Sequence, residues 1–341
     1  MTIEFNNTYL KDVSTTAGLL ESKGTFGKYY DKTYNDYYLG EKTFEKAEIK
    51  MIDDAVNILL NKTNIKKEDV NVFIGSDLLN QITPNAYYSS KLQRPFLGVY
   101  NACASLCEEF IIASSLLQNK SVKNILVNTS SHNMTAERQY RNPVEYGCPK
   151  PKRSTYTVTG ATCALLTKEK TNIKITSGTI GTVTDMDITD VYDMGSVMAS
   201  SAARTINEHL KNTNTKPEDY DLILTGDLGI YGKKILKEYM KEEYNIILNN
   251  YEDSGSIVYN LNNQKVVNAG GSGPACIGLT LFTDVFNKLK NGTYKKVLAV
   301  ATGALMSPTM NNQKLSIPSI SHAVCLEVIR WYFYIHFCFV G

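Results

Sequence analysis

Helix-like and strand-like patterns of apolar positions alternate along this chain. Apolar side chains at helical spacing, such as Met51, Ala55 and Ile58, predict a helix over about residues 44–61. A second helix is predicted over about residues 196–211. Each helix is followed by a polar turn and then by a short apolar run that ends in a glycine and an aspartate. The pattern therefore predicts the succession helix, turn and buried strand at two places in the chain.

These two places also match each other in sequence. Residues 63–78 align with residues 213–228 without a gap. A weaker match relates residues 119–127 to residues 291–299, and both of these segments enter a strand rich in small and β-branched residues. The identical pairs of the first match are Thr63/Thr213, Asn64/Asn214, Lys66/Lys216, Glu68/Glu218, Asp69/Asp219, Asp77/Asp227 and Leu78/Leu228. Two matches in the same chain order indicate an internal duplication.

A duplicated pattern of this kind predicts an α/β fold. We expect two βαβαβ halves whose mixed sheets stack, with helices between and outside them. The N-terminal half is predicted to span residues 1–175 and the C-terminal half residues 176–327. Residues 328–341 are strongly apolar and aromatic but too short to span a bilayer. They are interpreted as a membrane-surface anchor, a buried terminal element or a sequence artefact such as a frame slip, and the last two are favoured.

A cysteine stands at a predicted junction between a strand and a helix. A short buried strand is expected to run into Asn101, Ala102 and Cys103, and an apolar-faced helix follows over about residues 104–118. Unpaired backbone N–H groups and the helix dipole at such a junction stabilise a thiolate, or hold an anionic or carbonyl oxygen of a ligand. The alternative is a small buried cysteine at a tight turn. Local spacing leaves both interpretations open.

Several motifs resemble known families. The segment from Tyr100 to Ser105 resembles the nucleophile elbow of the β-ketoacyl synthase III and thiolase superfamily. Over roughly residues 20–327 the chain is similar, more specifically, to the stage V sporulation protein AD family of spore-forming bacteria. The segments that carry this second resemblance are residues 130–147, 150–152, 157–161 and 317–324.

The resemblance implies a thiolase-like fold and a role in sporulation. The family is implied to bind pyridine-2,6-dicarboxylic acid (dipicolinate), as the free acid or as its calcium chelate. It is implied to act with the membrane proteins of the stage V sporulation A operon, which load the acid into the forespore and release it at germination. A homodimer, peripheral at the inner membrane of the spore, is also implied.

Two catalytic partners of the synthases are missing from the matching positions. The resemblance implies a His after a strand of the second half and an Asn in a later glycine-rich loop. Residues 226–229 and 270–274 hold neither. Gly303 matches the second oxyanion donor of the superfamily. We therefore predict a pocket that is retained and a catalytic activity that is lost, with Cys103 as a vestigial nucleophile.

The chain has four histidines, of which one is expected near the cysteine. His132, at the end of a strand predicted over residues 124–130, is expected to reach the pocket of the cysteine. His209 is expected on a solvated helix face, and His322 is expected to make a structural hydrogen bond just before the terminal strand. His336 lies in the uncertain apolar end.

A pocket for dipicolinate needs donors at two points with an apolar slot between them, because the ligand is a flat ring with two carboxylates. Arg138 and Arg141 are the candidate cations, since the planar guanidinium pairs with both oxygens of a carboxylate. The alternative is that they pair locally with Glu137 or Glu145. The other predicted contacts are the backbone around Ala102 and Cys103, the side chains of Asn101, His132 and Thr159, and Gly303.

Composition argues against several classes of partner and site. The formal net charge of +2 gives no reason to expect a nucleic-acid partner, and seven cysteines without a CxxC pair argue against a disulfide framework and a zinc site. We predict no metal and no cofactor. The chain begins without a signal-peptide pattern, and no apolar run approaches the roughly 20 residues that span a bilayer. Two alternative functions stay open, a scaffold of a membrane transport complex with a vestigial pocket and an acyl-thioester transferase that uses Cys103.

Overall fold

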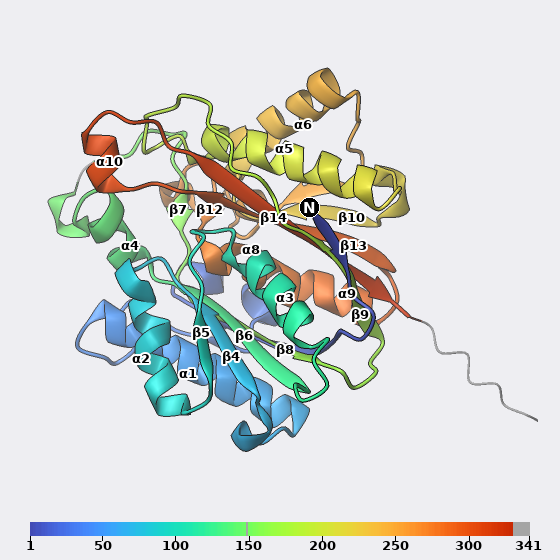
Figure 1. Cartoon of the computed structure of the whole chain (residues 1–341). Coiled ribbons are helices and arrows are strands. Elements are labelled where there is room, and N and C mark those ends of the chain that lie inside the picture. Colours follow the sequence, from blue (N-terminus) through green and yellow to red (C-terminus); the bar gives the residue numbers. More distant parts are fainter. Residues whose placement is uncertain (148, 330–341) are drawn as a thin grey trace, which may run out of the picture.

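The computed structural model describes residues 1–147 and 149–329 and consists of two similar halves (Figure 1). In the first half the strands are β1 (Thr2–Glu4), β2 (Tyr9–Ala17), β3 (Lys32–Thr33), β4 (Val72–Ser76), β5 (Phe96–Gly98), β6 (Asn124–Ser131), β7 (Tyr156–Thr157) and β8 (Gly160–Thr167). The helices of this half are α1 (Phe44–Thr63), α2 (Thr83–Leu92), α3 (Ser105–Leu116) and α4 (Asn133–Tyr140).

The second half repeats this order. Its strands are β9 (Ile173–Thr179), β10 (Leu222–Thr225), β11 (Tyr251–Asp253), β12 (Gly271–Ser272), β13 (Lys296–Ala304) and β14 (Ser319–Val328). Its helices are α5 (Met194–Asn212), α6 (Gly229–Tyr244), α7 (Ser254–Ile257), α8 (Pro274–Thr280), α9 (Phe286–Lys290) and α10 (Pro308–Asn312), with a π-helical segment (Leu281–Val285) between α8 and α9. The boundary predicted after residue 175 falls inside β9.

Both halves use the same mixed strand order. The first half has the order β5-β4-β6-β8-β2 and the second half β11-β10-β13-β14-β9. In each half the first three strands of this order run parallel, and the last two pair antiparallel to their neighbours. The halves join where β2 and β9 pair, at Tyr9 with Lys174 and Leu10 with Ile173. The predicted duplication is therefore confirmed as two equivalent half-sheets in one hydrogen-bonded sheet.

The helices form three layers around the two half-sheets. Helices α3 and α8, with the π-helical segment, pack between the half-sheets, where Phe110 and Phe282 meet edge to face at 6.1 Å between ring centroids. Helices α1 and α2 cover the outer face of the first half-sheet, and α5 and α6 cover the outer face of the second (Figure 1). Five alternating layers of helix and sheet result, which is the stacked arrangement expected from the sequence.

The duplicated sequence explains how the equivalent helices end. Asn64 and Asn214, an identical pair of the repeat, follow α1 and α5 with φ angles of 52° and 51°. Asparagine tolerates this left-handed conformation better than most residues. The repeat therefore conserves a backbone turn between each long helix and the strand that follows it.

Three local expectations were wrong. The strand before Cys103 was expected to be buried, but among the described strands β5 lies at the sheet edge, paired with β4, and Leu97 is 42 % exposed. His209 was expected on a solvated face, but it is fully buried and its Nδ1 lies 2.7 Å from Thr179 Oγ1. His322 lies within β14, opposite Ala301, and not before the strand.

The apolar end was predicted to span residues 328–341. Val328 is the last residue of β14, and residues 330–341 lie outside the described residues. Within the described part of the chain, none of the helices combines the length and apolar character that crossing a membrane requires.

Candidate functional site

Cys103 lies in a sharp turn immediately before α3. Ala102 has a φ of 49°, a left-handed conformation that costs energy for a residue with a Cβ atom. Ser105 stabilises the turn: its Oγ accepts a hydrogen bond from the backbone N–H of Asn101 at 3.1 Å and donates one to the carbonyl of Ala102 at 2.9 Å. The predicted elbow is therefore present.

Gly303 on β13 packs directly against this elbow. A Cβ atom at Gly303 would lie 2.6 Å from the carbonyl oxygen of Asn101 and 2.9 Å from the backbone nitrogen of Ala104. No side chain fits in this space. Gly303 therefore lets a strand of the second half approach the turn of the first half.

A narrow cavity of about 50 Å³, here called the inner pocket, opens above Cys103. Its wall combines apolar side chains with a few polar ones. It is lined by Leu78, Tyr100, Ala102, Cys103, Ala136, Glu137, Tyr140, Arg141, Thr157, Met194, Met198, Asp227, Ser272, Ala304 and Met306. Both halves of the chain contribute to the lining, as expected for a site between two duplicated halves.

Asp227 is a buried acidic lining residue that was not predicted from the sequence. It follows β10 where the synthase resemblance implies a His, and it is fully buried. Its carboxylate accepts hydrogen bonds from Thr302 Oγ1 at 2.5 Å and from the backbone N–H of Gly273 at 3.0 Å. Burial raises the pKa of Asp227 to about 6, although these donors and the Cys103 thiol oppose the shift. The signal for this residue was the identity of Asp77 and Asp227 in the repeat.

The surroundings of Cys103 favour the protonated thiol over the thiolate. Burial raises its pKa well above the usual value, and the neighbouring Asp227 carboxylate raises it further. The hydrogen bond from Gly273 and the charge of Arg141 act in the opposite direction but are smaller. Because the pKa of the thiol lies above that of the carboxyl group, the proton stays on sulfur. The stabilised thiolate considered from the sequence is not what this geometry favours.

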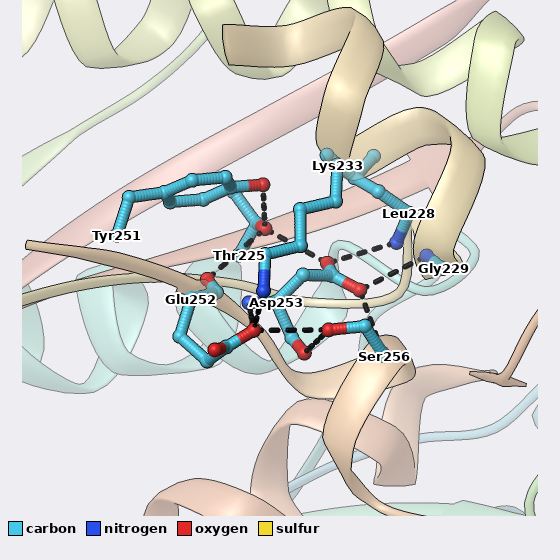
Figure 2. Close-up of polar contacts among 8 residues, drawn as sticks. All are labelled: Thr225, Leu228, Gly229, Lys233, Tyr251, Glu252, Asp253 and Ser256. Atoms are coloured by element: carbon cyan, nitrogen blue, oxygen red, sulfur yellow. Dashed lines mark hydrogen bonds and ion pairs between the residues drawn. The ribbon is translucent and has the colours of Figure 1, made fainter. Parts of the chain in front are cut away.

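A second buried carboxylate fixes the segment that carries Asp227 (Figure 2). Asp253 Oδ1 accepts hydrogen bonds from Thr225 Oγ1 at 2.8 Å and from the N–H of Leu228 at 3.0 Å. Asp253 Oδ2 accepts from the N–H groups of Gly229 and Ser256, both at 2.9 Å. These donors lie on both sides of Asp227 and at the starts of α6 and α7. The network therefore holds the backbone around Asp227 rigidly.

Glu252 completes the network of Figure 2 at the protein surface. It pairs with Lys233 of α6 and accepts a hydrogen bond from Ser256 Oγ at 2.9 Å. These bonds tie α6 to α7 without entering the inner pocket. Asp253 and Glu252 are neighbours with different surroundings: burial raises the pKa of Asp253 to about 7, whereas Lys233 and other donors lower that of Glu252 despite its partial burial.

The structure separates the two predicted arginines. Arg141 lines the inner pocket with a side chain only 7 % exposed, and its Nη1 pairs with Glu137 Oε1 at 2.9 Å. Its buried Nε has no hydrogen-bond partner among the described residues. Arg138 has a side chain 51 % exposed, pairs with Glu45 and does not line the pocket. The alternative of local pairing with Glu137 is therefore confirmed for Arg141. This pairing still leaves the buried Nε of Arg141 without an acceptor among the described residues.

His132 and Thr159 are placed behind the pocket wall. His132 is buried and caps α4, because its Nδ1 accepts a hydrogen bond from the N–H of Met134 at 3.2 Å. Its proton is therefore on Nε2, which lies 2.8 Å from the carbonyl of Tyr37, and burial lowers its pKa to about 4. Thr159 Oγ1 accepts from the N–H of Asn133 at 3.1 Å. Neither side chain lines the inner pocket.

Asn101 points away from the pocket. Its side-chain amide lies 2.8 Å from Nε2 of His322, whose Nδ1 accepts a hydrogen bond from the N–H of Gly181 at 3.1 Å. Burial lowers the pKa of His322 to about 4, so the ring is neutral. The structural hydrogen bond expected for His322 is confirmed, and it supports the elbow from behind.

No group of three or more His, Cys, Asp or Glu side chains that could hold a metal ion occurs within residues 1–147 and 149–329.

Comparison with solved structures shows the fold. A 3-oxoacyl-[acyl-carrier-protein] synthase III from Aquifex aeolicus VF5 aligns with a TM-score of 0.57 and 15 % identity, over 94 % of this chain and 99 % of that one. A single-residue variant of OleA from Xanthomonas campestris aligns with a TM-score of 0.58 and 13 % identity, over 95 % and 97 % of the two chains. The fold is therefore that of the thiolase-like condensing enzymes. At this level of identity the likeness says nothing about activity.

Comparison of sequences shows the family. Residues 1–327 match the family described as stage V sporulation protein AD. The stage V sporulation protein AD of Bacillus subtilis (strain 168) is 43 % identical over 319 residues, which cover 94 % of both chains. The chain belongs to the stage V sporulation protein AD family of sporulation proteins, as its motifs indicated.

Proposed function

We propose that the inner pocket binds dipicolinate without transforming it. The observation that carries the proposal is the side chain of Arg141, which is buried in the pocket and whose Nε has no acceptor among the described residues. A buried guanidinium donor without an acceptor is costly, and a ligand carboxylate supplies the acceptor that is missing.

The arrangement around Cys103 supports a binding role. Thioester condensation needs a group that activates the cysteine and a donor that stabilises the enolate. Beside Cys103 lies Asp227, whose negative charge opposes both formation of a thiolate and development of an enolate. Among the lining residues in the described part of the chain there is no imidazole. The pocket therefore has the means to hold an anion but not the means to activate the thiol.

The rest of the lining suits a flat ring with a carboxylate at each side. Arg141 supplies the charged donor for one carboxylate, and the carboxyl group of Asp227 becomes a second donor when it is protonated, below its pKa of about 6. Three methionines, Met194, Met198 and Met306, form an apolar wall. Because methionine side chains adapt readily, we expect this wall to move when the ring enters the narrow pocket.

Within the sporulation role of the family, this binding serves uptake of dipicolinate into the developing spore and its release at germination. The protein acts at the inner spore membrane as a peripheral homodimer and passes its ligand to the membrane proteins of the same operon. The ligand enters as the free acid or as its calcium chelate.

The test is a calorimetric titration of the full chain with dipicolinate, with and without calcium. Arg141→Lys keeps the charge but removes the planar fork, so we expect affinity to fall by about tenfold or more. Arg138→Lys is the matched control, because Arg138 lies three residues away and outside the pocket. The affinity of this variant for dipicolinate should equal that of the parent. Thermal melting of each variant separates loss of binding from loss of folding. Absence of heat and of a thermal shift at millimolar dipicolinate would overturn the proposal and favour a scaffold with a vestigial pocket.

Acyl transfer is a second candidate, because the strained elbow around Ala102 and the close approach of Gly303 are both present. Incubation with acetyl-coenzyme A followed by mass spectrometry distinguishes the two functions. We expect Cys103 to stay unmodified, because its proton stays on sulfur. A stable acyl group on Cys103, absent from Cys103→Ala, would establish the transferase instead.

A further inference from the structure

A second cavity lies on the other side of the wall of the inner pocket. It measures about 460 Å³, within the range of about 300–1,000 Å³ typical of small-molecule sites. Its lining includes Tyr37, Asn142, Lys150, Tyr156, Tyr192 and Asn268. We call it the outer cavity. The inner pocket, by contrast, has room for only a few water molecules in this conformation.

The two cavities share a thin wall. Successive residues of β7 face opposite sides, so that Tyr156 lines the outer cavity and Thr157 the inner pocket. On α4, Glu137 borders both cavities. Glu137 therefore stands in the wall between the two cavities.

Glu137 is held by one cation from each side. Its Oε1 accepts from Arg141 Nη1 at 2.9 Å and from Lys150 Nζ at 2.8 Å. Arg141 lines the inner pocket and Lys150 the outer cavity. One carboxylate thus faces two positive charges, which leaves an excess of one positive charge in a wall where the Glu137 side chain is only 4 % exposed. On the side of the outer cavity this excess favours an additional anion.

Both cations also lie over aromatic rings. The Nζ of Lys150 is 5.6 Å from the ring centroid of Tyr156, and the guanidinium carbon of Arg141 is 5.5 Å from that of Tyr192. Tyr156 and Tyr192 both line the outer cavity. A cation beside tyrosine faces is a site for a planar ring that carries a carboxylate, because the ring packs on the aromatic surface while the carboxylate pairs with the cation.

We propose that the outer cavity is a second binding site for a planar aromatic carboxylate and serves as the entrance to the inner pocket. Its ligand is the ligand of the inner pocket, so this inference rests on the proposed function. Lys150 pairs with the incoming carboxylate, the tyrosines receive the ring, and Glu137 is the barrier between the two sites. When the ligand pairs with Lys150, Glu137 loses that partner and keeps Arg141. When a ligand reaches the inner pocket, its carboxylate accepts from the Arg141 Nε, which has no partner among the described residues, while Nη1 stays with Glu137. Both cations and Glu137 therefore keep a partner when both sites are filled.

The experiment combines calorimetric stoichiometry with stopped-flow association of dipicolinate on the full chain. The parent is expected to bind two equivalents. Lys150→Gln should lose one equivalent and associate about tenfold more slowly, while the affinity of the remaining site stays within about twofold of the parent. Lys150→Arg should restore both quantities. Lys152→Gln is the matched control, because Lys152 is an exposed lysine two residues away.

Arg141→Lys separates this inference from the proposed function. Arg141→Lys should weaken binding at the inner site and leave one equivalent bound at the outer site. Adding Lys150→Gln to this variant should remove that equivalent. The outer site would be overturned, and the inner one kept, if the parent binds a single equivalent with two properties. Arg141→Lys would weaken this binding, and Lys150→Gln would change neither its stoichiometry nor its association rate. Absence of any binding in the parent would overturn both.

Discussion

Asp77 and Asp227 occupy equivalent positions in the two halves and differ in what surrounds them. Each follows the central parallel strand of its half, each is fully buried, and burial raises the pKa of each to about 6. Asp77 accepts hydrogen bonds from the N–H of Leu79 at 2.9 Å and from the backbone and side chain of Asn85, both at 3.1 Å. Asp227 faces Cys103 and the inner pocket instead. Duplication therefore supplied two identical carboxylates, one of which supports the fold and one of which lines a site.

The largest effect is expected at the structural member of the pair. Asp77→Ala removes the acceptor of three buried N–H donors, so the free energy of unfolding should fall by about 3 kcal/mol or more. Urea denaturation measures this change. Asp227→Ala serves as the comparison, because Asp227 accepts from a single backbone N–H, that of Gly273, and from the Thr302 hydroxyl beside a cavity. Equal losses in the two variants would refute the division of roles.

A smaller effect, on binding, is expected at the other member. Above its pKa of about 6 Asp227 is charged and repels the carboxylates of dipicolinate, whereas below it the protonated group donates a hydrogen bond. The affinity of the parent should therefore rise by about tenfold between pH 7.5 and pH 5.5. Calorimetry over this range measures the change. Asp227→Asn should flatten the profile, and Asp77→Asn should keep it. A parental pH profile in Asp227→Asn would contradict the placement of this carboxyl group beside the ligand.

The pH dependence of the free energy of unfolding also tests the raised pKa of Asp227. The pKa of Asp227 is raised above its unfolded value of 3.8, so its contribution to stability is fully present below that value and is lost as the pH rises through about 6. Asp227→Asn should therefore gain stability relative to the parent between pH 5 and pH 8, by about 1 kcal/mol. Thermal melts across this range would show the two curves diverge. A constant difference would mean that Asp227 does not titrate in this window.

The smallest effects are expected where the two halves behave alike. Asn64→Ala and Asn214→Ala each place alanine in a left-handed conformation and should each cost about 1 kcal/mol. The corresponding glycine variants should lie within about 0.5 kcal/mol of the parent. Chemical denaturation of the four variants tests this equivalence. A loss confined to one asparagine would show that the two helix ends are not equivalent.

The sequence predicted the fold well because duplication is a local and repeated signal. The matched segments placed the ends of the long helices and the strands after them, and Asn64 and Asn214 are identical because both end a helix in the same conformation. Edge and interior strands are not distinguished by such a pattern. The strand at Leu97 was therefore expected to be buried, although it lies at the edge of the sheet.

The site was predicted less well because it depends on contacts between distant segments. Arg138 and Arg141 look alike in sequence, and only the fold shows that Glu45, far away in the chain, pairs with Arg138 at the surface. In the sequence, the segment around Asp227 was notable only because it lacks the expected histidine. The identity of Asp227 with Asp77 in the repeat was the signal that it is a buried carboxylate. The role of Lys150 follows from its contact with Glu137, which no spacing rule predicts.

The most direct measurement is a crystal structure of the full chain with dipicolinate at about pH 6. We expect one ligand in the inner pocket, with a carboxylate within hydrogen-bond distance of the Arg141 guanidinium, displaced methionine side chains and an unmodified Cys103. A ligand bound only outside the wall formed by α4 and β7, with Arg141 still paired to Glu137 alone, would contradict binding of dipicolinate in the inner pocket.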